Sequence, residues 1–431
     1  MLIDTRKSPW AKAHPLPQEW IHWKDGLWKE RFTVCVNSMV PHIRSVFEDN
    51  SGIFHVVENF RVAAGIHDGG HEGTPFGDGD FYKWMEAAVY AAIKGGDKKL
   101  EADLEDYVAL IGKCQRPDGY LSTKQIISEM KGDSGARNKD INEFEVYNFG
   151  HLFTSACVYK RLTGKDSFLS IAAKAADYLG RMYEDAIKTG NVKTAVCPSH
   201  YMGLIELYRT TGEKKYLELA ALCVNIRDSV KDGTDDNQDR LPLREHRKIT
   251  GHGVRSTYLY AGLADLYAET GEADFQEVLD SCWENLVTQK MYITGGCGAL
   301  YQGVSPLWDF LHGGKTHQSF GYEYQLPNIT AYNETCAALG SIFWNYRMFT
   351  IKPEAVYFDI IERTMLNLAL AAVSLDGKKY FYENMLRRTK GLDYKLTWPL
   401  ERDDQLTCYC CPSNLVRVIA QSMEYAYMVS A

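Results

Sequence analysis

The fold is decided by a stretch that recurs along the chain, Tyr159-Lys160-Arg161-Leu162-Thr163-Gly164-Lys165-Asp166-Ser167-Phe168. Related stretches run over 208–216 and 267–275. In each stretch an aromatic residue closes a helical pattern, a glycine takes the C-terminal turn, and a polar and an aromatic residue open the next helix. The three glycines (Gly164, Gly212 and Gly271) are separated by about the length of a helical hairpin and its loop. This loose repetition predicts helical hairpins arranged in an array or a closed toroid.

The segments before the repeat are helical as well. Apolar residues follow helical spacing from Asp80 to Ala92, and this pattern ends at Gly95-Gly96. The helical period resumes from Lys98 to Cys114, and an earlier one runs from Trp28 to Val46 within a packed N-terminal arm. Strand signals are few, and the best of them, 378–384, predicts a small β insertion. We therefore predict an all-α fold that forms one domain over 1–431.

The composition limits the classes of partner and the location. The chain has 431 residues, 45% of them hydrophobic, and a net charge of -8 without basic runs, so no nucleic-acid or membrane partner is expected. The first residues lack the apolar core of a signal peptide, and no segment approaches the ~20 apolar residues of a membrane span. Eleven cysteines, an odd number, fit a reducing compartment better than a disulfide framework. The expected location is cytoplasmic.

A cysteine cluster is the strongest chemical signal in the chain. It comprises Cys408-Tyr409-Cys410-Cys411-Pro412-Ser413-Asn414 together with Glu334-Thr335-Cys336. Three thiolates and one carboxylate suit tetrahedral zinc, so we expect a metal site. The alternative is that these cysteines are buried small apolar side chains. Because Pro412 makes a sharp turn, we expect the last helix to start near Ser413 and to run from Leu415 to Met428.

Several other polar residues interrupt helical patterns and are candidates for binding. They are His151, His200, His252, Glu362, Tyr382 and Glu383. A lone histidine at the start of a helix, as expected for His151, is more often a cap or a satisfied core residue than a functional group. The two glycines that flank His252 allow a ligand to approach closely, so a binding role is about as well supported there as a structural one.

The chain resembles glycoside hydrolase family 127, the retaining β-L-arabinofuranosidases. The matching segments are Asn59–Gly65, Asp80–Ala88, Gln115–Leu121, Gly150–Leu152, Gly251–Tyr260, Leu326–Ala338 and Cys408–Asn414. The resemblance implies an (α/α)6 toroid and a zinc ion. It implies that the zinc ligands are Glu334, Cys336, Cys410 and Cys411, and that the sugar subsite contains His151, His252, Glu362 and Tyr382, with His200 as a weaker match.

The implied reaction is a double displacement in which the Cys410 thiolate attacks the anomeric carbon and water then releases the sugar. The resemblance places the general acid sixteen residues before Glu334, where this chain has Gln318. An amide has no titratable proton to give to a leaving group. Either another group serves, with Glu323 and Glu362 as candidates, or the leaving group needs less help. Whether Gln318 is natural or engineered stays open.

Three functions follow from these expectations. The leading hypothesis is a zinc-thiolate glycoside hydrolase that releases L-arabinofuranose or a related furanose from plant-derived glycans. The alternatives are an aceric acid hydrolase acting on pectin side chains and a non-catalytic sugar-binding toroid that has lost its acid residue. An isomerase on the same toroid is disfavoured, because it does not need the cysteine cluster. The β-sandwich domains that usually follow in the family are expected to be absent from this chain.

Overall fold

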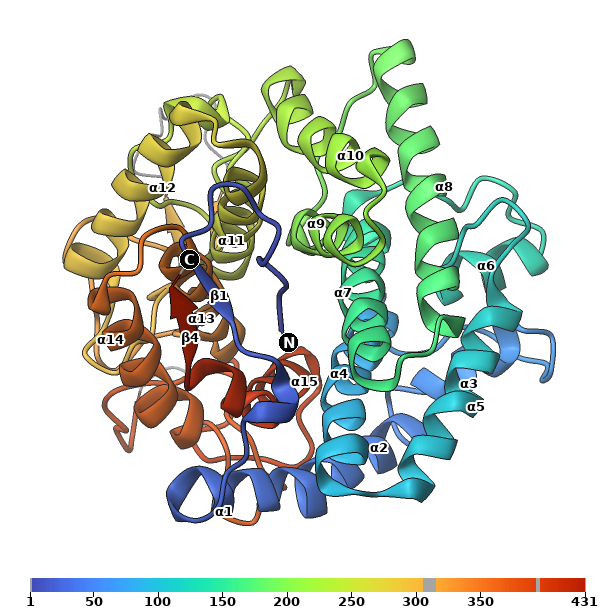
Figure 1. Cartoon of the computed structure of the whole chain (residues 1–431), viewed down its shortest axis with the longest axis horizontal. Coiled ribbons are helices and arrows are strands. Elements are labelled where there is room, and N and C mark those ends of the chain that lie inside the picture. The colour runs from blue at the N-terminus through green and yellow to red at the C-terminus, as the bar shows by residue number, and fades with distance from the viewer. Residues whose placement is uncertain (1, 305–314, 393–395, 431) are drawn as a thin grey trace.

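Six helices stand side by side in a closed ring (Figure 1). The computed structural model describes residues 2–304, 315–392 and 396–430. The ring helices are α4 (Gly77–Gly95), α7 (Glu145–Thr163), α9 (Ser199–Thr211), α11 (Gly253–Thr270), α13 (Thr335–Ile351) and α15 (Cys410–Ala420). Each packs against the next in chain order, and α15 packs against α4, so the ring closes.

A second layer of helices surrounds the ring. Its members are α5 (Lys98–Cys114), α8 (Ser167–Thr189), α10 (Lys214–Asn225), α12 (Ala273–Asn285) and α14 (Ala355–Thr364), each packed on the inner helix that precedes it in the chain. The sixth place, beside α15, is taken by α1 (Gly26–Val34) and α2 (Val40–Glu48), which are joined by a π-helical turn, Cys35–Met39. The helices α3 (Val56–Ala63) and α6 (Thr123–Met130) fill the space beside α5. The predicted helical toroid is therefore confirmed.

The glycine caps explain how the hairpins are made. Gly164, Gly212 and Gly271 end α7, α9 and α11 with φ of 76°, 77° and 67°, a left-handed conformation that glycine adopts without a Cβ penalty. Gly96 ends α4 in the same way. Inner helices such as α11 and α13 are buried on nearly every face, whereas outer helices such as α8 bury one face only. The outer layer therefore shields the ring from solvent.

The strands are short and lie outside the ring. β1 (Ala13–Pro15) pairs antiparallel with β4 (Met428–Ser430), and β2 (Leu300–Val304) pairs antiparallel with β3 (Lys315–Ser319). The strand predicted over 378–384 is wrong, because Tyr380 and Glu383 form only isolated bridges to Val373, Asp403 and Glu334. In the described ranges, no helix combines the length and the apolar character needed to span a membrane.

The last ring helix begins earlier than predicted. It starts at Cys410 rather than near Ser413 and ends at Ala420, followed by a 3-10 turn, Ser422–Tyr425. Pro412 lies in its first turn, where the missing backbone N–H of proline is not needed for helical bonding. Cys410 and Cys411 consequently occupy the first two helical positions, at the mouth of the ring formed by the N-terminal ends of the inner helices.

The N-terminal arm crosses the opposite mouth of the ring (Figure 1). The backbone N–H groups of Trp10 and Lys12 donate to the carbonyls of Ala268 and Thr350, at 3.0 and 2.7 Å. Both carbonyls lie near the C-terminal ends of inner helices, α11 and α13. The arm therefore covers this mouth, and the first turns of the ring helices form the other.

Candidate metal centre and active site

Four predicted ligands meet at the mouth where the inner helices begin. Glu334 is the residue before α13, Cys336 is the second residue of that helix, and Cys410 and Cys411 open α15. One ligand atom from each lies within 4.8 Å of the other three. The packing of α13 against α15 thus joins two segments that are more than seventy residues apart.

The spacing of these atoms fits a tetrahedral zinc ion. The two sulfurs of Cys410 and Cys411 are 3.9 Å apart, and Oε1 of Glu334 lies 3.9 Å from the first and 3.7 Å from the second. Zinc bonds of ~2.3 Å to sulfur and ~2.1 Å to oxygen give tetrahedral edges of roughly 3.6–3.8 Å. Oε2 of Glu334 is buried without a hydrogen-bond partner. The donor set and its geometry therefore suit zinc.

Charge in the cluster concentrates on one sulfur. The thiols of Cys336, Cys408 and Cys411 beside Cys410 hold the pKa of its thiol well below the ordinary value. Burial, followed by the charge of Cys410, raises the pKa of Glu334. Cys410 is also the one member of the four-residue group that is not fully buried. It is therefore the thiolate that a ligand can reach. Cys408 lies 3.3 Å from it, outside the group.

Two aromatic side chains lie next to the sulfur of Cys410 or stack on its neighbour. The hydroxyl of Tyr382 lies 3.4 Å from Sγ of Cys410. The indole of Trp398 stacks on the Tyr382 ring with a centroid distance of 3.8 Å and an interplanar angle of 10°. The structure thus brings Tyr382 to the cluster, as expected, and adds Trp398, which no sequence signal singled out.

Gln318 lies in a hydrogen-bonded chain that fixes its orientation. His252 is the N-cap of α11, and its Nδ1 accepts the N–H of Val254, so the proton of this neutral ring lies on Nε2. That N–H donates to Oε1 of Gln318 at 2.5 Å, and Nε2 of Gln318 donates to the hydroxyl of Tyr332 at 2.5 Å. Trp398 also donates to this hydroxyl, at 3.2 Å. The amide is therefore held by donors and acceptors that match it on both sides.

Two histidines on inner helices, His151 on α7 and His200 on α9, lack hydrogen-bond partners among the described residues. Both ring nitrogens of His151 and of His200 are buried and unpaired among the described residues. Burial lowers the pKa of each ring, to about 3 for His200, so both are neutral. His151 packs edge-on against Tyr147 at 4.5 Å and lies in the second turn of α7, not at the helix start as predicted. Buried polar groups without partners are expected where a ligand supplies the missing bonds.

Two predicted residues are not brought to the cluster. Glu323 forms an ion pair with Lys248 at 2.7 Å, and this bond lowers the pKa of its carboxyl. Glu362 is exposed on α14, in the outer layer of the toroid. Neither carboxylate belongs to the group of four ligand residues. Glu362 instead faces solvent.

Lys83 is a residue of this centre that sequence analysis missed. It lies on α4, wholly buried, and forms an ion pair with Asp80 at 2.7 Å. Its Nζ donates to the hydroxyl of Tyr147 at 2.8 Å and to the carbonyl oxygen of Cys410 at 3.2 Å. The available signal was Asp80, Lys83 and Glu86 at a spacing of three in an otherwise apolar helical pattern.

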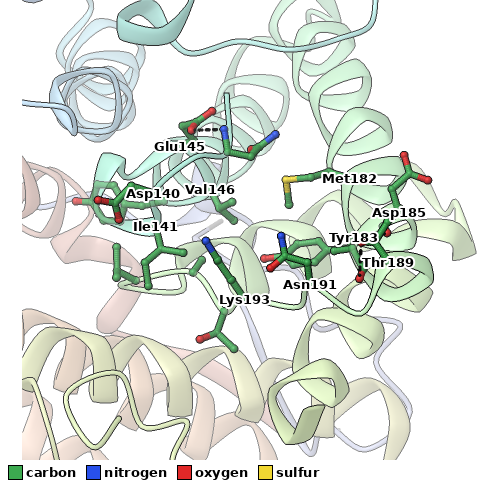
Figure 2. A pocket seen from close by; sticks show the side chains of 16 residues that line it. Asp140, Ile141, Glu145, Val146, Met182, Tyr183, Asp185, Thr189, Asn191 and Lys193 are labelled. Atoms are coloured by element: carbon green, nitrogen blue, oxygen red, sulfur yellow. Dashed lines mark hydrogen bonds between the residues drawn. The ribbon is translucent and has the colours of Figure 1, made fainter. Parts of the chain in front are cut away.

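A cavity of about 270 Å³ lies between α7, α8 and the segment 191–196 (Figure 2), and none of the four cluster residues lines it. Tyr147 forms part of its wall, and Ile141, Val146 and Met182 provide apolar surface. A neighbouring cavity of about 530 Å³ shares part of this lining and extends to Thr316, two residues before Gln318. Seven carboxylates line the two cavities, against four cations. They are Asp140, Glu145, Asp185, Asp232, Asp235, Asp236 and Asp239, against Lys193, Lys231, Arg240 and Arg255.

Known proteins of similar sequence and structure share this architecture. Residues 20–424 match the model of a protein family described as "Beta-L-arabinofuranosidase, GH127 catalytic domain". A "Non-reducing end beta-L-arabinofuranosidase" of Bifidobacterium longum subsp. longum is 32% identical, over 93% of this chain and 65% of its own length. A GH127 β-L-arabinofuranosidase structure from Geobacillus stearothermophilus T6 is 31% identical, with a TM-score of 0.82 over 95% of this chain and 66% of that one.

A further solved structure, a "Glycoside hydrolase", is 41% identical, with a TM-score of 0.81 over all of this chain and 63% of that one. The helical toroid and the cluster at its mouth thus define a catalytic domain of the glycoside hydrolase class. The chain belongs to family GH127. It spans a little under two thirds of the length of these relatives.

Proposed function

We propose that this chain forms one catalytic domain of a zinc-thiolate retaining glycoside hydrolase that releases L-arabinofuranose or a related furanose from plant-derived glycans. One observation carries the proposal: three thiols and a carboxyl converge within 4.8 Å, and Cys410 alone among them is partly exposed. Glu334, Cys336, Cys410 and Cys411 would hold the zinc. When bound, the zinc ion would stabilise the thiolate both as a ligand and as a leaving group.

The chain's own residues divide the remaining work. The Cys410 sulfur forms a bond to the anomeric carbon while the bond from that carbon to the leaving oxygen breaks. Water then forms a new carbon–oxygen bond and releases a proton to the solvent, while the carbon–sulfur bond breaks and the thiolate returns with its electron pair. Two displacements retain the configuration at the anomeric carbon. The unpaired nitrogens of His151 and His200 are suited to hold sugar hydroxyls.

The leaving group receives no proton from residue 318. Gln318 presents an amide held by His252 and Tyr332, and neither bond supplies a titratable proton. Because Glu323 is ion-paired to Lys248 and Glu362 is exposed on an outer helix, these candidate acids are poorly placed to replace it. We infer that the departing oxygen takes its proton from water, so the enzyme favours substrates with good leaving groups.

The charge around the two cavities next to α7 favours one of the two hydrolase hypotheses. Their lining carries more carboxylates than cations, which disfavours an anionic pectin fragment through like-charge repulsion. Two of the relatives named above are β-L-arabinofuranosidases, and L-arabinofuranose is a neutral sugar. We therefore rank a neutral furanoside above aceric acid as substrate. The unpaired histidines alone are also compatible with a sugar-binding toroid that performs no reaction.

The experiment that tests this proposal is a substrate screen combined with metal analysis. The purified chain is incubated with aryl β-L-arabinofuranosides and, separately, with pectin oligosaccharides that contain aceric acid, and its zinc content is measured. We expect turnover of the aryl furanosides by protein with about one zinc per chain. Release of aceric acid without furanoside turnover would support the second hydrolase hypothesis. Sugar binding with no turnover of any substrate would support the non-catalytic toroid.

A further inference from the structure

Lys83 is a buried cation to which the proposed reaction assigns no role. Its side chain is 0% exposed, and its ammonium group has three partners: the carboxylate of Asp80, the hydroxyl of Tyr147 and the carbonyl oxygen of Cys410. An ammonium group has three protons to donate, so these partners use all of them. Lys83 is therefore held in one position, although lysine loses much rotamer entropy when it is fixed.

The three partners come from three neighbouring helices of the ring. Asp80 lies on α4 with Lys83, Tyr147 lies on α7, and Cys410 opens α15. The bond to the Cys410 carbonyl thus joins the backbone of the candidate nucleophile to the two helices beside it. Since α15 begins at Cys410, a shift of this residue would carry the sulfur with it. Lys83 is placed to prevent that shift.

The positive charge of Lys83 also offsets negative charge at the cluster. Three thiolates and one carboxylate carry more negative charge than a divalent zinc ion offsets. The ammonium lies 3.2 Å from the carbonyl oxygen of Cys410, so its positive charge stands beside the residue that opens α15. A buried lysine costs free energy unless its charge is paired, and the Asp80 carboxylate supplies this partner on α4 itself.

We propose that Lys83 is a positioning residue for the reaction: it fixes the backbone of Cys410 and offsets negative charge at the cluster. The sulfur then keeps one position while the carbon–sulfur bond forms and the leaving oxygen departs, and while water later breaks that bond and the sulfur regains its electron pair. This inference rests on the proposed role of Cys410 as nucleophile. It adds a residue that never touches the substrate.

The test compares two double variants, one at each mouth, that replace both members of a buried ion pair. Asp80→Asn with Lys83→Met removes the pair at the cluster without leaving an unpaired carboxylate. Asp265→Asn with Arg347→Met is the matched control at the opposite mouth, where these residues are also ion-paired and buried. Steady-state kinetics with an aryl β-L-arabinofuranoside, zinc content and folded fraction are measured for both. The single variant Lys83→Arg, which keeps a positive charge, is measured alongside.

We expect the cluster variant to lose about 100-fold in kcat with KM and zinc content unchanged, because a nucleophile misplaced by about 1 Å costs this much. Lys83→Arg should recover part of the loss, and the control should keep its kcat. An unchanged kcat in the cluster variant, or a loss that parallels lost zinc or lost folded protein, would overturn the inference. Absence of turnover in the unmodified chain would instead overturn the proposed function on which the inference rests.

Discussion

The two mouths of the ring differ in how their buried polar groups are paired. At the mouth crossed by the N-terminal arm, Arg209 bonds Glu206, Asp265 and Glu269 at 2.6–2.7 Å. Ser8 of the arm donates to Glu269 at 2.5 Å. Charges from α9 and α11 thus compensate one another, and the arm adds a further bond. This mouth has the properties of a structural seal.

The opposite mouth contains buried polar groups that lack partners. Both nitrogens of His151 and His200, Oε2 of Glu334 and Oε1 of Glu383 make no hydrogen bond among the described residues. Burial raises the pKa of the Glu383 carboxyl to about 7. Unsatisfied buried groups destabilise a fold, and a metal ion at Glu334 or a ligand at the histidines would supply the missing bonds. The comparison predicts that substitutions at the two mouths have different consequences.

The largest expected effect is a loss of kcat at the mouth where the inner helices begin. Cys410→Ser replaces the candidate nucleophile by a hydroxyl that is far less nucleophilic, and we expect kcat to fall by about 10⁴-fold or more. Cys408→Ser is the matched control, since its sulfur lies 3.3 Å from Cys410 but outside the four-ligand group. It should stay within about tenfold of the unmodified chain. Equal losses in the two variants would show that the cluster is a packing unit and that Cys410 has no special role.

At the mouth crossed by the N-terminal arm, the expected loss is in the free energy of unfolding. Arg209→Met leaves the carboxylates of Glu206, Asp265 and Glu269 without their shared cation, so we expect the free energy of unfolding to fall by about 3–5 kcal/mol. Chemical denaturation measures this loss. The kcat of the folded fraction should be unchanged. A variant of normal stability with reduced kcat would contradict the division between the two mouths.

Gln318→Glu restores a titratable group beside the cluster. We expect turnover of substrates with poor leaving groups, such as alkyl furanosides, to rise by about 10²-fold, the lower end of general acid catalysis. Turnover of aryl furanosides with good leaving groups should change little. The ratio of the two rates is the measurement. A fall in both rates would mean that the amide's bonds to His252 and Tyr332 matter more than the missing proton.

The smallest expected effect is on the pH dependence of stability, and it concerns a histidine whose two ring nitrogens both have partners. His246 contacts the hydroxyl of Tyr260 and the carbonyl of Leu241, and burial lowers its pKa to about 4. Because the folded pKa lies below the ordinary value of 6.5, its contribution to stability is present above pH 6.5 and is lost as the pH falls toward 4.

The difference in the free energy of unfolding between the unmodified chain and His246→Gln should therefore decrease by about 2 kcal/mol from about pH 7.5 to pH 5. Denaturant unfolding at the two pH values measures this change, and kcat at neutral pH serves as the control. A gap that is constant with pH would mean that the ring is not held neutral by burial.

The sequence predicted the ring because its hairpins depend on local signals. Gly164, Gly212 and Gly271 take the left-handed conformation expected of helix caps, and the helix from Lys98 to Cys114 has the predicted bounds. The strand predicted at 378–384 failed because its aromatic residues pack against the core and form only single bridges. A run of aromatic residues favours a strand but does not determine whether a neighbouring strand is available to pair with it.

The site was predicted in part for a similar reason. The metal site was predicted from short motifs that contain thiol and carboxyl groups, the ligands that zinc prefers. Its residues converge as expected: Glu334, Cys336, Cys410 and Cys411. Glu362 does not join them, because its position depends on which layer of the toroid its helix occupies. Lys83 and Trp398 were missed, since their contacts with distant residues arise only when the ring closes.

The central claim is that Cys410 forms a covalent bond to the sugar. Mass spectrometry of the chain, quenched with acid during turnover of an aryl β-L-arabinofuranoside and then digested, tests this claim most directly. We predict a pentosyl adduct on the peptide that contains Cys410, absent from the Cys410→Ser variant. Product formation with no adduct on this peptide, or with an adduct on another residue, would contradict the account.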